Sequence, residues 1–578
     1  MPEPQQETAN QERVPFGAKW TSFFSQREEQ VFLVLTLVIG ALVGAVVVAF
    51  ILLTQRFGVR IYAGHAGASW PRFVIPVAGS LAMGYLLFRF FPDARGSGVP
   101  QTKAALYARE GRISLSTVFG KFFCTSATLA CGIPLGREGP SVQVGAGIAS
   151  VLGRKLGLRP EKVKALIPVG AAAAVAAAFN TPLAAVLFAL EEVVGDLHAP
   201  VLGLVVLASA TSWAVLRILL GNAPLFKVPE YQLVHPIELI AYAVLGIVGG
   251  LISVAFSRLL LWLRKKFLSF PRRTAWFHPV IGGLVVGGIG WFVPQVPGVG
   301  YIHVGEALNG DLALRVMVLL LVLKFFAVVV SYSSGNAGGI FGPSLFLGAM
   351  LGGVVGTVAH RLIPGYVGGP GAYALVGMGT AFAGIVRAPM TSVVMIFEIT
   401  RDYAVIVPLM ISNLLSFFIS ARLQPKPIYD ELAKQDGIHL PGEEPHTGAG
   451  QVRLETILRP ALDLLPADLS PSVALEKLRS SGFRALPVLS DRGVEGMVSV
   501  ELLQQTQASD AKTLSHLLAP DSFPHLHRDH TVAQALDRMA ASRMDLLPVV
   551  SRANIHQIEG VVTLSDVLAR YGVSALKD

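Results

Sequence analysis

The stretch Gly136-Arg137-Glu138-Gly139-Pro140-Ser141 places a charged pair between glycines, and the run that follows, 142 to 151, carries no charge. Later in the chain, Gly339-Ile340-Phe341-Gly342-Pro343-Ser344 keeps the glycines, the proline and the serine at the same positions. The second copy replaces the charged pair with Ile340 and Phe341. A repeat of this kind predicts one backbone arrangement that is used twice, with charge in the first copy alone.

The composition around these stretches is that of an integral membrane protein. Of the 578 residues, 52% are apolar and 15% are charged, and the mean hydropathy is +0.57. Residues 31 to 53 carry no charge and are long enough to cross roughly 30 Å of hydrocarbon as a helix. We therefore expect an all-α polytopic membrane domain, with similar apolar runs near 73–91, 113–135, 165–190, 201–221, 236–262, 279–298, 312–333, 341–359 and 371–421.

The glycines beside Arg137 and Glu138 allow another backbone or a ligand to approach closely. Pro140 suits the first turn of a helix, whose free amides would face back toward Glu138. At membrane depth a helix start is tolerated only inside protein or beside a polar cavity. Because broken helices that meet in mid-membrane form the binding sites of secondary transporters, the stretch predicts such a site.

A second pair of matching blocks strengthens the internal repeat. The block from Gly170 to Glu191 has the same spacing as the block from Gly377 to Glu398, with a proline at the equivalent place in each. Together with the broken helices, this duplication favours an inverted repeat. Because Glu191 and Glu398 occupy equivalent positions, we interpret them as architectural acids that cap or brace a helix end.

Two other acids break this symmetry. Glu138 aligns with Phe341, and Glu192 aligns with Ile399. An ionisable group inside a membrane is costly and usually functional, so Glu138 and Glu192 are the candidate functional acids. For Glu192 an alternative is that its side chain, near the end of a span, reaches water.

The loop Gly96-Ser97-Gly98-Val99-Pro100 precedes a segment rich in helix formers. A glycine-rich loop before a helix presents amides and a hydroxyl, which are groups that bind an anion. The same residues also form ordinary turns, so the loop by itself leaves both interpretations open.

Several other features exclude classes of function. The net charge of +9 is spread over loops and span ends, where it favours membrane orientation over binding of nucleic acid. Cys124 and Cys131 lie in one apolar segment, which is typical of small buried hydrophobes and not of a metal site. The polar residues 1–27 lack the apolar core of a signal peptide and are interpreted as a cytoplasmic tail.

The character of the chain changes after residue 435. Residues 436–451 are rich in glycine, proline and acids and predict a linker, and residues 574–578 form a short tail. The region 452–573 is doubled, because Leu486-Pro487-Val488 is echoed by Leu547-Pro548-Val549. Helix-period segments alternate with short strands, which predicts an α/β pair with copies at about 452–508 and 513–573.

These motifs, with the late Tyr429, resemble those of the CLC family of chloride channels and proton-coupled chloride exchangers over residues 28–435. The resemblance implies an inverted-repeat homodimer in the lipid bilayer, with one anion pathway in each subunit. It also implies that the hydroxyls of Ser97 and Tyr429 and the amides of Ile340 and Phe341 bind the anion. The matched selectivity motifs are Gly96, Gly98, Pro100, Gly136, Arg137, Gly139, Pro140, Gly339, Gly342 and Pro343.

The same resemblance makes Glu138 the gating glutamate and Glu192 the internal proton glutamate of an exchanger. Chloride and protons would then be the substrates, and Ser97 favours chloride because nitrate-preferring relatives tend to carry proline there. The alternative is a passive voltage- or pH-gated chloride channel of the same fold. Lys103 departs from bacterial exchangers that have an acid at this position, and we expect it to alter the inner mouth without touching an anion ligand.

The tail is similar to a pair of cystathionine-β-synthase (CBS) domains. In that resemblance Thr563 and Asp566 would hold the phosphate and ribose of an adenine nucleotide, while a purely structural dimerising tail is the alternative. The chain contains neither a His-Glu-x-x-His motif nor a Gly-x-x-x-x-Gly-Lys-Ser/Thr loop, so an intramembrane metalloprotease and a primary pump are not supported. We expect a multi-pass protein of the plasma (inner) membrane that is not an enzyme, with cytoplasmic termini and no metal or other cofactor.

Overall fold

The computed structural model describes residues 28–62, 69–221, 226, 228, 231, 233–438, 440, 452–461, 464–506, 513–518 and 523–571. The chain forms two compact units, residues 1–440 and 441–578, which are described separately below. The predicted tails at 1–27 and 574–578 and most of the predicted linker 436–451 lie outside the described residues. The domain boundaries therefore stay predictions.

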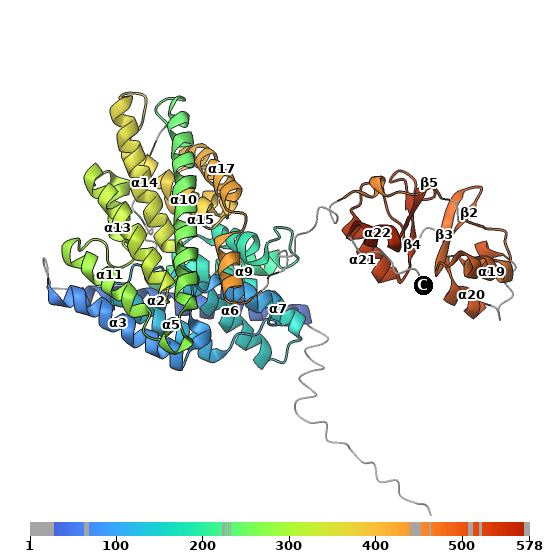
Figure 1. Cartoon of the computed structure of the whole chain (residues 1–578), viewed down its shortest axis with the longest axis horizontal. Coiled ribbons are helices and arrows are strands. Elements are labelled where there is room, and N and C mark those ends of the chain that lie inside the picture. The colour runs from blue at the N-terminus through green and yellow to red at the C-terminus, as the bar shows by residue number, and fades with distance from the viewer. Residues whose placement is uncertain are drawn as a thin grey trace, which may run out of the picture. The chain divides into compact units, whose positions relative to one another are not determined.

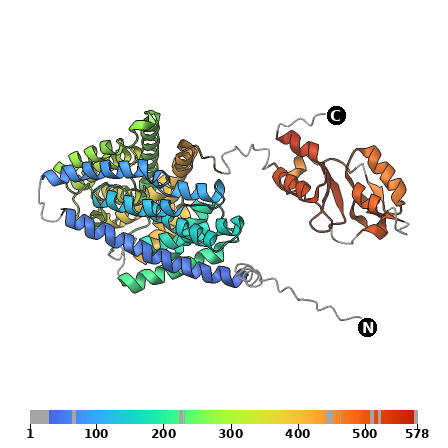
Figure 2. The same ribbon diagram turned by 90° about the horizontal axis from the view of Figure 1, so that it is seen from below.

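The regular elements in the described part of the first unit are helices, joined by loops and one isolated bridge, and they are shown from two directions (Figure 1; Figure 2). Eight of the described helices are long and apolar enough to cross a membrane. The helices are α2 (Glu28–Tyr62), α3 (Trp70–Arg89), α4 (Val99–Tyr107), α5 (Leu115–Ala130), α6 (Glu138–Lys155), α7 (Pro160–Phe179), α8 (Pro182–Phe188), the π-helix η2 (Ala189–Val194), α9 (Leu202–Leu220), α10 (Glu238–Ser269), α11 (Pro279–Phe292), α12 (Tyr301–Asn309), α13 (Leu314–Ser333), α14 (Phe341–Leu362), α15 (Pro370–Ile385), α16 (Pro389–Thr400), α17 (Ile406–Leu423) and α18 (Ile428–Gln435).

The predicted broken helices are present at equivalent places in the two halves. Between α7 and α8, Asn180 has a φ of 62°, and between α15 and α16, Arg387 has a φ of 68°. A proline opens the next helix in both cases, and the residue before a proline is disfavoured in the helical conformation. The run 371–421, which the sequence presents as one apolar region, is therefore divided into α15, α16 and α17.

Glycines bring α6 close to α7 and α14 close to α15. A Cβ atom added at Gly145 would collide with the carbonyl oxygen of Gly170, and one added at Gly348 would collide with that of Gly377. Small residues permit this close approach of helix backbones inside a membrane. The two contacts are equivalent in the repeat, so both halves use the same packing to fix the helices that follow their Gly-Pro motifs.

The second unit consists of two similar α/β copies, as the doubled sequence predicts. Its strands form one sheet in the order β1-β2-β3 and a second sheet of β4 and β5, with β1 parallel to β2 and the hairpins β2-β3 and β4-β5 antiparallel. One buried core joins the first copy to Leu546, Val550 and Val561 of the second, and another lies mainly within the second copy. The elements are β1 (Leu465–Pro466), α19 (Pro471–Ser481), β2 (Ala485–Ser490), β3 (Gly493–Ser499), α20 (Val500–Thr506), α21 (Val532–Ser542), β4 (Leu546–Val550), β5 (Ile558–Thr563) and α22 (Leu564–Arg570).

Candidate functional site

The two copies of the Gly-Pro motif meet through their first glycines. The amide of Gly136 donates to the carbonyl oxygen of Gly339 at 2.8 Å, and the amide of Gly339 donates to that of Gly136 at 2.7 Å. The two strands of this bridge run antiparallel. The motifs are therefore related by a local two-fold arrangement, as expected for halves of opposite orientation.

The Ser97 loop packs against the same point. Gly96 and Gly98 have φ values of 83° and 104°. Residues other than glycine rarely adopt this backbone conformation. A Cβ atom added at Gly98 would collide with the carbonyl oxygen of Gly139, and one added at Gly139 would lie 2.6 Å from the carbonyl oxygen of Ser97. The glycines of two separate motifs are thus required by the close approach of their backbones.

The four residues expected to bind the anion are all buried. The hydroxyls of Ser97 and Tyr429 have no hydrogen-bond partner in the part of the chain that the structure describes. Ile340 and Phe341 stand at the start of α14, where the first amides of a helix have no intrahelical acceptor. Buried donors of this kind are what a dehydrated anion needs.

Tyr429 lies near the end of the first unit, and its helix packs close to the Ser97 loop. It lies on α18, which packs on α4, the helix that begins directly after the Ser97 loop. The fold therefore places the expected anion ligand of α18 beside the helix that follows Ser97.

Glu138 is fully buried and reaches from the start of α6 to the start of α14. Its Oε2 atom would lie 2.9 Å from a Cβ atom added at Gly342, and in the described structure Oε2 accepts no hydrogen bond. Its Oε1 atom accepts a hydrogen bond from the hydroxyl of Tyr301. One donor, the hydroxyl of Tyr301, therefore holds the carboxylate of Glu138. The carboxylate lies beside the start of α14, which is also where the anion is expected to bind.

Tyr301 was not singled out by the sequence, because it lies 163 positions from Glu138 and outside every repeated motif. The guanidinium of Arg137 stands 5.7 Å from the centre of the Tyr301 ring, and Phe226 packs edge-on against that ring at 5.6 Å. These contacts fix the ring and so aim its hydroxyl at Glu138.

Two buried lysines support the loops of the site. Lys121 donates to the carbonyl oxygens of Ala94 and Gly96 at 3.0 and 2.5 Å, beside Ser97. Lys324 donates to those of Val296 and Gly298 at 2.7 and 2.5 Å, in the loop that leads to Tyr301. Each lysine precedes the first glycine of its motif by the same spacing, and this repeat in the sequence was missed.

The two symmetric acids have the architectural role predicted for them, because each caps a helix of the opposite half. Glu191 accepts hydrogen bonds from the amides of Met390 and Thr391 at 3.2 and 2.8 Å, at the start of α16. Glu398 accepts from the amides of Leu183 and Ala184 at 2.9 and 2.8 Å, at the start of α8. A carboxylate at a helix start satisfies free amides and interacts favourably with the helix dipole.

Glu192 follows Glu191 in the π-helix η2, but its side chain contacts Lys103 and not the start of α16. Its Oε1 atom lies 3.1 Å from the Nζ atom of Lys103, which also lies 2.6 Å from the Oδ1 atom of Asp430. Lys103 thus contacts the predicted proton glutamate directly. The alternative that Glu192 simply reaches water is wrong, since only 6% of its side chain is exposed.

Comparison with known proteins decides the family. The model of the voltage gated chloride channel family matches residues 78–421, and the CBS domain model matches residues 454–503 and 518–572. Over 423 residues the chain is 33% identical to a protein of Salmonella arizonae named H(+)/Cl(-) exchange transporter ClcA, covering 70% of this chain and 89% of that relative. The chain belongs to the CLC family.

Solved CLC structures agree with this assignment. A slow cyanobacterial Cl-/H+ antiporter is 26% identical and has a TM-score of 0.65, covering 70% of this chain and 97% of that one. A eukaryotic CLC transporter, 21% identical with a TM-score of 0.61, shares the fold over 93% of this chain and 97% of its own length. The predicted fold, a CLC membrane domain followed by a CBS pair, is confirmed.

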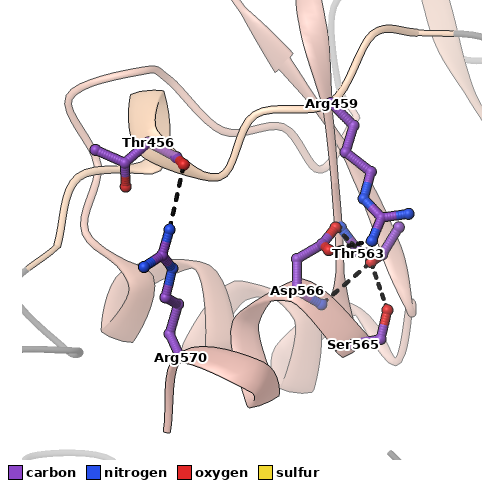
Figure 3. Close-up of polar contacts among 6 residues, drawn as sticks. All are labelled: Thr456, Arg459, Thr563, Ser565, Asp566 and Arg570. Carbon is purple, nitrogen blue, oxygen red and sulfur yellow. Dashed lines mark hydrogen bonds and ion pairs between the residues drawn. The ribbon is translucent and has the colours of Figure 1, made fainter.

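In the second CBS copy of this CLC protein, the predicted nucleotide residues lie together at the start of α22 (Figure 3). The Oδ2 atom of Asp566 accepts hydrogen bonds from the amide and hydroxyl of Thr563 at 3.3 and 2.7 Å. Its Oδ1 atom forms an ion pair with Arg459. Thr563 is therefore the N-cap of α22, while Asp566 completes the capping box and pairs with an arginine whose side chain is more than half exposed. The first copy has Leu502 in place of the aspartate.

Proposed function

We propose that this CLC protein exchanges chloride for protons across the membrane, with Glu138 as the gating glutamate and Glu192 as the internal proton glutamate. One observation carries the proposal: the carboxylate of Glu138 is buried at the start of α14 with one oxygen that accepts no hydrogen bond from the described chain. A buried carboxylate in that state is costly, which favours a group that takes up and releases a proton. The similarity to relatives named as exchangers supports the same reaction.

The proposed mechanism is a competition for one helix terminus. A carboxylate and a chloride ion are both attracted to the free amides at the start of α14, so the charged form of Glu138 beside them opposes the entry of an anion. Protonation removes the charge of Glu138 and frees the position for chloride. Glu192 then exchanges this proton with the other side of the membrane, while Ser97 and Tyr429 donate hydrogen bonds to the anion between the two acids.

The test uses purified protein in liposomes under a chloride gradient, with the external pH recorded. Chloride moving down its gradient is expected to drive protons against theirs. Chloride flux without proton movement would contradict the exchange and leave the passive channel as the function of this fold.

Replacing Tyr301 with phenylalanine tests how Glu138 is held. The ring packing is retained, but the charged carboxylate loses a hydrogen bond worth about 1.5–3 kcal/mol. We expect Glu138 to compete less well, so chloride flux rises several-fold and the number of protons moved per chloride falls. Tyr403→Phe, at a side chain that is 77% exposed, is the control and should change neither quantity. Unchanged coupling in Tyr301→Phe would show that the hydroxyl does not hold the gate.

We also propose that the protein is a homodimer in the plasma (inner) membrane with both termini in the cytoplasm. The dimer is what membership of the CLC family implies, and the basic loops support the orientation. Nucleic acid has no part in this proposal.

Adenine nucleotide binding at Thr563 and Asp566 remains a separate proposal, in which Arg459 is the cation paired with Asp566. Binding to the folded state alone stabilises it by about 2.7 kcal/mol at one hundred times Kd. Millimolar ATP, ADP or AMP is therefore expected to raise the melting temperature of the CBS unit by several degrees. Asp566→Asn should remove the rise and Ser499→Ala, at the equivalent place in the first copy, should keep it. An unchanged melting temperature with all three nucleotides would favour a structural tail.

A further inference from the structure

Lys103 connects three elements of the proposed transport site. It lies on α4, directly after the Ser97 loop, and it contacts Glu192 on η2 and Asp430 on α18. Asp430 is adjacent in sequence to Tyr429, although it is 327 positions from Lys103. A single ammonium group thus joins the segments that carry the inner anion ligands and the internal acid.

Among the residues in direct contact, one ammonium faces two carboxylates, so these three residues carry an excess of one negative charge when all are ionised. The guanidinium of Arg387 also interacts with Asp430 and Glu192, but it forms no ion pair with either carboxylate within 4 Å. The exposed fractions of the side chains are 13% for Lys103, 6% for Glu192 and 25% for Asp430. Two carboxylates that share one contacting cation are costly in such a buried place, and a single proton on either carboxylate lowers that cost.

The other ionisable groups around the cluster have their hydrogen bonds elsewhere, although the charge of Arg387 still acts on both carboxylates. Arg387 donates to the carbonyl oxygens of Ser420 and Gln424, and Tyr107 donates to that of Val194. Glu191, the neighbour of Glu192, caps α16. Lys103 is therefore the cation that the two carboxylates share, and the balance between them depends on where one proton resides.

We propose that Asp430 is the first proton acceptor on this route and that it passes its proton to Glu192, with Lys103 as a positioning residue. The inference rests on the proposed exchange function. The more exposed carboxylate of Asp430 takes a proton from solution and forms an O–H bond, which leaves Lys103 paired with Glu192. The proton then moves to Glu192 and Asp430 becomes a carboxylate again. Lys103 keeps its three protons and holds both carboxylates on one nitrogen atom.

The helix that carries Asp430 is anchored independently of this ion pair. Arg264 of α10 donates to Gln435 at 2.9 Å and pairs with Asp436, both at the end of α18. Ile428, Tyr429 and Leu432 of the same helix are buried. Removing the carboxylate of Asp430 should thus leave Tyr429 in place and chloride transport working.

The test compares Asp430→Asn with the wild type in the same liposome assay. Proton flux is expected to fall by at least about tenfold while chloride flux changes less than about twofold. Asp430→Glu should restore the proton flux, which a merely structural role would not explain. Lys103→Arg should retain coupling, whereas Lys103→Met should lower the proton flux. Glu431→Gln, a carboxylate on the same helix, is the matched control and should behave as the wild type.

The outcomes separate this inference from the exchange function itself. A wild type that moves chloride without protons contradicts both. A coupled wild type with an equally coupled Asp430→Asn variant overturns the role of Asp430 alone. If the asparagine variant is not recovered folded, Asp430→Ser is measured in its place and is held to the same criterion, with chloride flux as the indicator of folded protein.

Discussion

Replacing Glu138 with glutamine is expected to abolish proton transport and to leave a chloride flux that no longer responds to pH. Glutamine has nearly the same shape and can still accept a hydrogen bond from Tyr301, but it cannot carry a proton. Because the acid transfers the proton itself, proton flux should fall by about two orders of magnitude or more. The neutral side chain also competes poorly with chloride for the amides of α14, so chloride should move at all pH values.

The measurement is the pH dependence of chloride flux, recorded together with proton movement in proteoliposomes between about pH 4 and 8. Arg137→Gln is a useful comparison, since it removes the neighbouring charge and leaves the acid in place. If Glu138→Gln retained coupled proton transport, the assignment of the gating role to Glu138 would be wrong.

Replacing Glu192 with glutamine is expected to abolish proton movement as well, but to leave chloride flux sensitive to pH. Glu138 remains able to take up a proton from its own side, so the competition for α14 persists. The route from the other side is cut, because a glutamine beside Lys103 accepts a hydrogen bond and no proton. The two glutamine variants thus differ in one readout, which is the response of chloride flux to pH.

Glu191→Gln is the matched control for this experiment. Glu191 is adjacent to Glu192, yet it accepts hydrogen bonds from α16 and takes no part in the cluster with Lys103. The variant should keep its proton coupling. Because glutamine caps the start of α16 less well, the free energy of unfolding should fall by about 0.5–2 kcal/mol. Loss of coupling in Glu191→Gln, with coupling retained in Glu192→Gln, would reverse the roles of the two acids.

The separation of these acids follows from the internal repeat of the chain. Equivalent acids in both halves, Glu191 and Glu398, are predicted to be architectural, and each caps a helix of the other half. The same comparison contains a further signal in Lys121 and Lys324, which precede their motifs by the same spacing and each support a loop of the site. An internal repeat identifies such residues because both halves need the same supporting contacts at equivalent positions.

By itself, the sequence determined the membrane class, the duplicated Gly-Pro motifs, the broken helices and the doubled α/β tail, since all of these follow from composition, local periodicity and spacing. Only the tertiary structure decided that Tyr301 holds Glu138 and that Lys103 joins Glu192 to Asp430. The physical reason is that these contacts connect segments distant in the chain. Such segments meet because glycine-lined helices pack closely, and no spacing within one sequence specifies which side chains then touch.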